Sequence, residues 1–255
     1  MFFTLNAVCG CGIGTGRSNN EDNFFFNKKH LPAQNKGLNN PMEYDATTEN
    51  PVVFAVFDGM GGECQGEEAA RLVSEVFSEE YKTLEELALS GKEFMLTTCE
   101  KANVAVNEYR REKQLSSIGT TAAAIYLAQN EVVACNVGDS KIFRIRDKKM
   151  TQISEDHTDE KILLKMGIQK KPVLLQYIGI PDTDMAMEPY VSKGEIQIGD
   201  TYVLCTDGVT DLIGVDRLYE MISRNPAEDA VRKITAEVNE TSGTDNATII
   251  VVKIA

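Results

Sequence analysis

Short apolar segments, bounded by glycine or polar residues, recur along the chain. Residues 52–57 form a continuous apolar run that is typical of a buried strand, and residues 201–206 form another apolar strand. Polar pairs such as Gln129-Asn130 separate neighbouring runs and fit short connecting turns. The same pattern predicts further strands over residues 2–9, 120–127, 131–137, 141–145, 150–153 and 247–254.

Helical spacing of apolar residues marks two long segments in the first half of the chain. Residues 66–90 and 93–114 each place their apolar side chains on one face of a helix, so the two helices are expected to pair and to cover a sheet. A third helix is predicted to end near residue 240. Asn225 would be its N-cap and Pro226 its first residue.

The grouping of these segments predicts the fold class. Strands fill the middle and both ends, while helices fall into two blocks, which favours an α+β sandwich of antiparallel sheets over alternating strands and helices. The glycines from Gly10 to Gly16 predict a tight loop after the first strand, and polar residues 27–50 predict an excursion between strands. No linker or repeat interrupts the chain, so residues 1–255 are expected to form a single domain.

The chain is acidic, with a formal net charge of −13, and its 42% hydrophobic content is enough for a full core. An acidic surface repels phosphate backbones and anionic lipids, so neither nucleic acid nor a membrane is expected as a partner. Most of the 39 acidic residues are interpreted as solvated surface groups. A smaller set, about six, is expected to hold cations.

The cysteines and histidines argue against a structural zinc site. The six cysteines form no Cys-x-x-Cys pair, and there are two histidines. Cys135 and Cys205 lie in apolar segments and are expected to be buried free thiols. The N-terminal residues lack the basic start of a secretory signal, and no apolar run approaches about 18 residues. A reduced cytoplasm is therefore the expected compartment.

Acidic residues stand at the ends of several predicted strands. Any one of them could be an ordinary exposed turn residue, but several at equivalent positions indicate a common cause. Carboxylates that converge at one edge of a sheet repel one another unless cations lie between them, and Mg²⁺ and Mn²⁺ prefer such hard oxygen ligands. The residues concerned are Asp58, Asp139, Asp207 and Asp245, with Glu21 and Asp22 after the glycine-rich loop.

The glycine-rich segment CGIGTGRS, residues 11–18, matches no nucleotide-binding pattern. A P-loop requires glycine where Cys11 stands and lysine where Arg17 stands, and the dinucleotide pattern requires a third glycine where Thr15 stands. Nucleotide binding here is therefore rejected. A lone loop arginine is usually a solvated charge, but the guanidinium of Arg17 could instead bind two phosphate oxygens.

Seven short segments, in order over nearly the whole chain, resemble the motif series of the PPM (type 2C) protein serine/threonine phosphatases in its bacterial version. One motif such as DGxGG would be weak, but coincidence does not explain seven in the family's order. The segments are GRSNNED (residues 16–22), VFDGMGG (56–62), IGTT (118–121), NVGDS (136–140), EDH (155–157), CTDGVTD (205–211) and TDN (244–246).

The resemblance implies a four-layer α-β-β-α sandwich of two antiparallel sheets flanked by helices. It also implies a site for two divalent cations, Mn²⁺ or Mg²⁺. Asp58 would bridge both ions, joined by the carbonyl of Gly59. Asp207 and Asp245 would complete the ligands of one ion, and Glu21 would be a ligand of the other.

Further residues of the site follow from the same resemblance. Arg17 would bind the substrate phosphate, Asp22 would lie in or next to the metal shell, and Asp139 would join Asp207 at a third, weaker ion. A water bridging the two cations would attack phosphorus in line, so no protein nucleophile is expected. Cys64 is not assigned that role, because a cysteine phosphatase requires an arginine six residues later and this chain has alanine there.

The chain departs from the family pattern at three places. Met60 stands where animal members carry a histidine proposed as the acid for the leaving group, and Lys141 stands where arginine is commoner. Residues 158–177 are shorter than the flap that bacterial relatives carry beside the active site. This segment is either an amphipathic helix with solvated lysines or a trimmed flap whose lysines attract phosphopeptides. The lysines are Lys161, Lys165, Lys170 and Lys171.

The expected function is therefore metal-dependent hydrolysis of phosphoserine and phosphothreonine in proteins that a serine/threonine kinase has modified. The enzyme is expected to be a monomer. The alternative is a catalytically inactive relative that binds phosphoproteins as a regulator, which the complete ligand set disfavours. A pure calcium-binding protein is disfavoured because the chain lacks a calcium-binding loop of regularly spaced acids.

Overall fold

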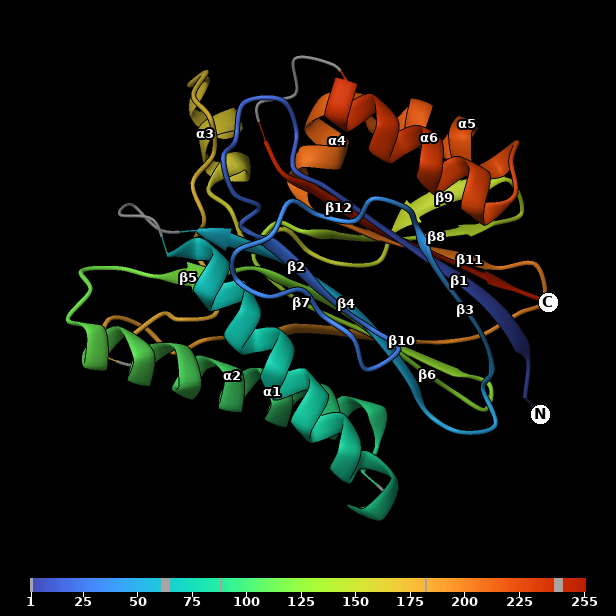
Figure 1. The fold of residues 1–255 in the computed structure, drawn as a ribbon, viewed down its shortest axis with the longest axis horizontal. Helices are drawn as coiled ribbons and strands as arrows, with labels where there is room; N and C mark the ends of the chain where they lie inside the picture. Colours follow the sequence, from blue (N-terminus) through green and yellow to red (C-terminus); the bar gives the residue numbers. More distant parts are fainter. Residues whose placement is uncertain (1, 61–64, 88, 182, 241–244) are drawn as a thin grey trace.

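The computed structural model describes residues 2–60, 65–87, 89–181, 183–240 and 245–255, and its strands form two antiparallel sheets that lie face to face (Figure 1). The first sheet has the spatial order β3 (Met42–Thr47), β1 (Thr4–Gly12), β12 (Ala247–Ile254), β11 (Thr201–Cys205), β8 (Lys141–Arg146) and β9 (Lys149–Gln152). The second has the order β10 (Tyr190–Glu195), β7 (Glu131–Val137), β6 (Ala122–Ala128), β4 (Val52–Met60) and β2 (Asp22–Phe26), with β5 (Gly119–Thr120) paired to β4.

Helices cover the outer face of each sheet (Figure 1). The helices α1 (Gly66–Leu87) and α2 (Gly91–Lys113) pack on the second sheet, and α4 (Asp207–Ile213), α5 (Val215–Ser223) and α6 (Ala227–Glu240) pack on the first. The short α3 (Glu160–Met166) stands at the end of the sandwich away from the two chain termini. These layers confirm the predicted α-β-β-α sandwich. None of the described helices is long and apolar enough to span a lipid bilayer.

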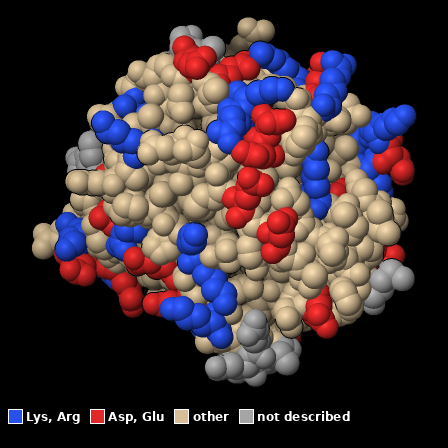
Figure 2. All heavy atoms as spheres, turned by 45° about the vertical axis from the view of Figure 1, so that its right-hand side comes forward, with Lys and Arg blue, Asp and Glu red and all other residues tan. Residues whose placement is uncertain are grey.

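Charged side chains are interspersed on the face that Figure 2 shows. Lysine and arginine lie near aspartate and glutamate, with neutral surface between the groups. The net negative charge is therefore not gathered into one acidic field on this face, which fits acids that mainly keep the surface solvated.

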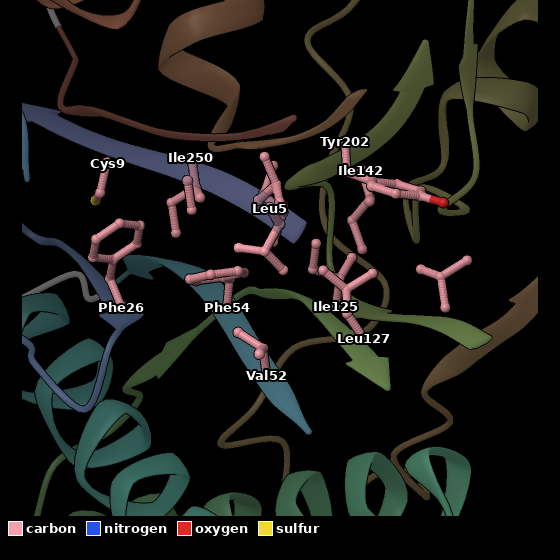
Figure 3. Packing of buried hydrophobic residues seen from close by; sticks show 14 of the residues in the cluster. Leu5, Cys9, Phe26, Val52, Phe54, Ile125, Leu127, Ile142, Tyr202 and Ile250 are labelled. Atoms are coloured by element: carbon pink, nitrogen blue, oxygen red, sulfur yellow. The ribbon is translucent and has the colours of Figure 1, made fainter. Parts of the chain in front are cut away.

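The main core fills the space between the two sheets. Figure 3 shows Phe26 and Phe54 of the second sheet facing Cys9 and Ile250 of the first. Full burial of a large apolar side chain contributes about 1.5–3 kcal/mol, so this layer holds the sheets together. The cysteines of the described residues are free and buried, as predicted for Cys135 and Cys205, whereas Cys64 lies outside those residues.

Two glycines that were expected in a tight loop lie inside β1. A Cβ atom on Gly10 would come within 2.5 Å of the side chains of Val231 and Thr235 in α6, and one on Gly12 within 2.8 Å of Asn239. The glycines therefore allow α6 to pack closely against the sheet. The prediction of a loop at these two positions is wrong. Glycine stands there because α6 leaves no room for a side chain, and not because the backbone turns.

Two further local predictions are corrected by the structure. The polar excursion of residues 27–50 contains β3, an edge strand in which half-buried and exposed residues alternate. The side chain of Asn225 does not cap α6, which begins at Ala227. Its Nδ2 donates to the carbonyl of Met221 at 2.7 Å and its Oδ1 accepts from Lys233 at 2.5 Å, so the amide ties α6 to the end of α5.

Candidate active site

A cleft of about 310 Å³ brings together residues from distant parts of the chain. Seven of the eight predicted site residues line it, the exception being Asp22. The lining consists of Arg17, Glu21, Asp58, Gly59, Met60, Thr121, Asp139, Lys171, Pro172, Leu174, Asp207 and Asp245.

The end of β4 holds Asp58 in a fixed backbone position. The amide of Asp58 donates to Oγ1 of Thr121 at 3.1 Å. Its carbonyl accepts from the amide of Thr121 at 2.9 Å and from Oγ1 of Thr120 at 2.8 Å. The Thr121 hydroxyl also bonds Ser140 at 2.6 Å, which links Asp58 to the turn that carries Asp139. Hydrogen bonds thus connect two segments that carry candidate ligands, the end of β4 and the turn after β7.

Two glycines let backbone segments meet at the cleft. A Cβ atom on Gly59 would lie 2.2 Å from the carbonyl oxygen of Gly66 and 2.5 Å from that of Glu21. One on Gly208 would lie 2.0 Å from the carbonyl oxygen of Asn246. No larger residue fits at either position without backbone movement. The segments that carry the candidate ligands can therefore approach only because glycine stands there.

Asn246 positions the loop that carries Glu21. Its Oδ1 accepts from the amide of Glu21 at 2.8 Å, and its Nδ2 donates to the carbonyl of Ile13 at 2.8 Å. The segment 244–246 was singled out in the sequence, but no role was assigned to Asn246, and Thr244 lies outside the described residues. Since the amide sits between the loop and β12, it sets the spacing of Glu21 and Asp245.

Asp22 lies behind the cleft rather than in its lining. The side chain is buried, and its Oδ2 accepts from the hydroxyls of Thr206 and Thr248, both at 2.8 Å. Burial raises its pKa to about 7, although both hydrogen bonds act in the opposite direction. Asp22 therefore lies next to the candidate ligands that line the cleft, and its Oδ2 is engaged by two hydroxyl donors.

Burial and mutual repulsion raise the pKa values of the clustered carboxyl groups. Burial has the largest effect on Asp58, followed by the charges of Asp22, Asp207 and Asp139, and its pKa lies well above the ordinary value. Burial, then Asp207, raises the pKa of Asp139 to about 6. Groups in this situation favour a compensating positive charge.

Arg17 supplies positive charge at one side of the cleft. Its Nη2 lies 2.7 Å from Oδ1 of Asp245 and its Nη1 lies 3.2 Å from Oε2 of Glu21. The arginine lowers the pKa of Glu21, but burial outweighs it and the net shift is upward. The guanidinium therefore binds two of the carboxylates that the sequence predicts as metal ligands.

The donor chemistry of the cluster suits a hard divalent cation. Carboxylate oxygens and the Gly59 carbonyl are ligands that Mg²⁺ and Mn²⁺ prefer, and the crowded carboxylates need a counter-charge. Across the described residues, no three His, Cys, Asp or Glu side chains already stand in a metal-holding arrangement. Arg17 already bonds Oε2 of Glu21 and Oδ1 of Asp245, so a cation at these carboxylates would compete with the guanidinium.

One of the four flap lysines reaches the cleft. Lys171 is exposed, and its Nζ lies 3.9 Å from Oδ2 of Asp207. Lys161 instead pairs with Glu155 at 2.9 Å. The base of the flap is held by His157, whose Nδ1 accepts from the amide of Gly138 at 3.2 Å. Burial lowers the pKa of His157, which fits a neutral ring that accepts this bond.

A larger groove of about 630 Å³ joins the cleft at Arg17 and Glu21. Gln34, Lys36 and Glu67 also line it. Sequence reasoning did not single out residues 34–36, because they lie in a polar loop without a pattern. The groove leaves room beside Arg17 for a chain longer than one phosphorylated residue.

Comparisons with known proteins agree with this fold and cleft. The family profile described as Protein phosphatase 2C matches residues 40–248. The serine/threonine phosphatase stp of Listeria monocytogenes is 29% identical over 223 residues, which cover 80% of this chain and 85% of that protein.

Two solved structures share the fold. The catalytic domain of the phosphatase PstP in complex with two manganese ions superposes with a TM-score of 0.76 at 24% identity, covering 100% of both chains. Phosphatase Stp1 of Staphylococcus aureus gives 0.76 at 22% identity, covering 98% of this chain and 94% of that one.

These matches define a protein serine/threonine phosphatase, the class that the ordered motifs predicted. The chain belongs to the protein phosphatase 2C family. The bacterial relatives agree with the bacterial type of the motif series.

Proposed function

We propose that this protein hydrolyses phosphoserine and phosphothreonine in proteins with divalent cations held by the carboxylate cluster. The observation that carries the proposal is the cleft itself. Five predicted acidic ligands and Arg17 line it together, although they come from segments across the whole chain. The PstP structure that contains two manganese ions has the same fold, which supports Mn²⁺ as a first choice for assay.

Each ligand has a proposed place in this site. Asp58, the Gly59 carbonyl, Asp207, Asp245 and Glu21, which line the cleft, would together hold two ions. Asp139, which lines the same cleft, would share a third and weaker ion with Asp207. When bound, the cations would activate water for attack and offset the charge of the phosphate.

The protein's own side chains would orient the substrate. Arg17 can direct two N–H groups at phosphate oxygens once it leaves Glu21 and Asp245. Met60 lines the cleft but cannot donate a proton, so it does not serve as the acid for the leaving group. No protein nucleophile is assigned, because direct attack by water needs none.

Phosphorylated proteins, the products of serine/threonine kinases, are the proposed substrates. The stp and PstP relatives carry serine/threonine phosphatase names, which supports this choice. We also propose that the chain acts as a cytoplasmic monomer and as one domain over residues 1–255.

The test is hydrolysis of para-nitrophenyl phosphate and of a phosphothreonine peptide, with Mn²⁺, with Mg²⁺ and with EDTA. Activity is expected with either metal and none with EDTA. Asp58→Asn and Asp245→Asn should abolish turnover, whereas Asp216→Asn, an exposed acid of α5, should not. Activity that survives thorough chelation would contradict the metal-dependent reaction. Phosphopeptide binding without turnover would instead indicate an inactive regulator.

A further inference from the structure

The flap, residues 158–177, exposes an unusual amount of apolar surface. Six of the eleven exposed large apolar side chains in the described part of the chain lie within it. In α3 the only buried residue is Leu163. We call the six residues the flap patch; they are Ile162 (54% exposed), Leu164 (71%), Met166 (67%), Ile168 (43%), Val173 (46%) and Leu175 (42%).

Hydrogen bonds fix the flap that carries this patch. The amide of Leu175 donates to the carbonyl of His157 at 2.8 Å, and the amide of Val173 donates to Oδ1 of Asp159 at 2.8 Å. At the end of α3, Gly167 takes a left-handed conformation and the amide of Ile168 returns to the carbonyl of Leu163 at 2.9 Å. The patch is therefore part of a hydrogen-bonded element whose apolar side chains remain 42–71% exposed in the described part of the chain. Surfaces of this kind mark interaction sites.

The same flap forms one wall of the active-site cleft. Lys171, Pro172 and Leu174 line the cleft together with Asp207 and Asp245. Leu174 lines the cleft, whereas its exposed neighbours Val173 and Leu175 are not among the lining residues. A small phosphoester can enter the cleft without touching the patch. A protein substrate extends over the rim and can contact it.

The charge of the flap indicates the chemistry of its partner. Residues 158–177 contain four lysines and two acidic residues, Asp159 and Glu160, so the flap carries a net charge of +2 in a chain whose net charge is −13. A basic and apolar surface is complementary to a segment that combines acidic and large apolar residues.

We propose that the flap patch is a docking surface for the substrate, and that it selects phosphoprotein segments with large apolar residues flanked by acidic ones near the phosphorylated residue. The proposal rests on the proposed function, because it requires the phosphorylated residue to occupy the cleft.

The experiment compares two acidic phosphopeptides. One has leucine and isoleucine near the phosphoserine, and the other has serine at the same positions. The test variant is Ile162→Ser with Met166→Ser, two exposed residues one helical turn apart. The matched control is Ile198→Ser, which is 77% exposed in the connection before β11. Both variants should hydrolyse para-nitrophenyl phosphate as the wild type does.

For the wild type, kcat/KM should favour the apolar peptide roughly tenfold, the scale expected when one large apolar side chain is buried. The double variant should lose this preference, and Ile198→Ser should keep it. Equal kcat/KM for the two peptides in the wild type, or a preference that the double variant retains, would overturn the proposal.

Two further measurements separate other occupants of the patch. A wild-type dimer in sedimentation that dissociates in the double variant would assign the patch to a second copy and overturn the proposal. Binding to anionic lipid vesicles that the double variant loses would overturn it as well. A wild type inactive on para-nitrophenyl phosphate would contradict the proposed function. The docking proposal would then be tested by measuring the affinity of the two peptides by fluorescence anisotropy, and the wild type must bind the apolar peptide more tightly.

Discussion

Arg17 has two possible sets of partners in one cleft. In the structure its guanidinium bonds Glu21 and Asp245, and in the proposed reaction it bonds the substrate phosphate. Both partners are anions, so the arginine can pass from one to the other without losing its charge compensation. Cations that take over the two carboxylates would thereby release Arg17 for phosphate.

Replacing Arg17 by alanine should therefore have two opposite effects. Mn²⁺ should bind severalfold more tightly, because a competing exposed ion pair worth about 0.2–1 kcal/mol is removed. KM for phosphosubstrates should rise about 10- to 150-fold, which corresponds to the loss of a hydrogen bond to a charged group. Arg17→Lys, which keeps the charge but not the fork, should be intermediate in KM. Unchanged metal affinity together with unchanged KM would assign Arg17 to ordinary loop solvation.

The raised pKa values predict a pH dependence for the metal-free protein. Burial first, then neighbouring carboxylates, raises the pKa of Asp58, and the pKa of Asp22 reaches about 7. A group whose pKa is raised by folding binds more protons in the folded state, so the free energy of unfolding falls as pH rises towards the folded pKa. His157, whose pKa is lowered, acts oppositely and costs stability as pH falls below about 6.5.

Asp58→Asn should isolate the carboxylate contribution. In EDTA at pH 8 the variant should be more stable than the wild type by about 1–3 kcal/mol, since a buried and unpaired charge is removed. At pH 5 a larger share of this carboxyl group is protonated than at pH 8, because burial raises its pKa, so the gain should be smaller; His157 contributes equally to both proteins. Urea unfolding at the two pH values measures the difference. A gain of the same size at both would show that charge is not its cause.

The residues of the site were predictable to different degrees. Asp58, Asp139 and Asp207 directly follow apolar strands, so their convergence could be expected from the chain alone. The position of Asp22 could not be predicted, because the hydroxyls of Thr206 and Thr248, which donate to its Oδ2, come from segments far away in the sequence. A one-dimensional pattern carries no information on which of two adjacent acids faces a cleft.

Helix α1 illustrates how an element can depend on a missing side chain. A Cβ atom on Gly66 would lie 2.7 Å from the backbone of Gly59. Gly66→Ala should therefore lower the free energy of unfolding by about 1–3 kcal/mol, since overpacking forces the helix away from β4. The matched control is Gly16→Ala, whose added Cβ meets nothing within 4 Å. Equal stability of the two variants in urea would refute the close contact.

The flap lysines should act on the encounter with substrate. Lys170 and Lys171 are exposed, and Lys171 lies near Asp207. Replacing both by glutamate should flatten the fall of kcat/KM with salt for an acidic phosphopeptide and leave kcat nearly intact, because rim charges mainly affect association. Lys148→Glu with Lys149→Glu, two exposed residues where the turn after β8 meets the start of β9, is the control. If the variant with both flap lysines replaced keeps the wild-type dependence of kcat/KM on salt, these lysines have no role in substrate association.

The predictable elements were those with strong apolar patterns. The strands β4, β7 and β12 and the helices α1 and α2 bury whole faces, which fixes their period in the sequence. The edge strands β3 and β10 are half-exposed, and α4 and α5 have seven and nine residues, so no clear period identified them. The loop predicted at Gly10 and Gly12 was wrong because glycine occurs both in turns and where a strand packs closely against a helix.

In the whole molecule, strand pairing within the two sheets brings segments that are distant in the sequence together around one cleft. β1 and β12, from opposite ends of the chain, pair along eight residues, from Leu5 with Ile254 to Gly12 with Ala247. This pairing places the loop of Arg17 and Glu21 beside Asp245. The sandwich was foreseen from the grouping of strands and helices, but strand order depends on such long-range pairs, which local patterns do not encode.

The most direct measurement is calorimetric titration of Mn²⁺ into protein that has been stripped with EDTA. Two ions per chain should bind strongly to the wild type, and a third should bind more weakly at Asp139 and Asp207. Asp58→Asn should lose both strong ions, because this side chain is the proposed bridge, while Asp216→Asn should bind as the wild type does. Absence of Mn²⁺ binding by the wild type, or unchanged binding by Asp58→Asn, would contradict the assignment of the carboxylate cluster as a two-metal centre.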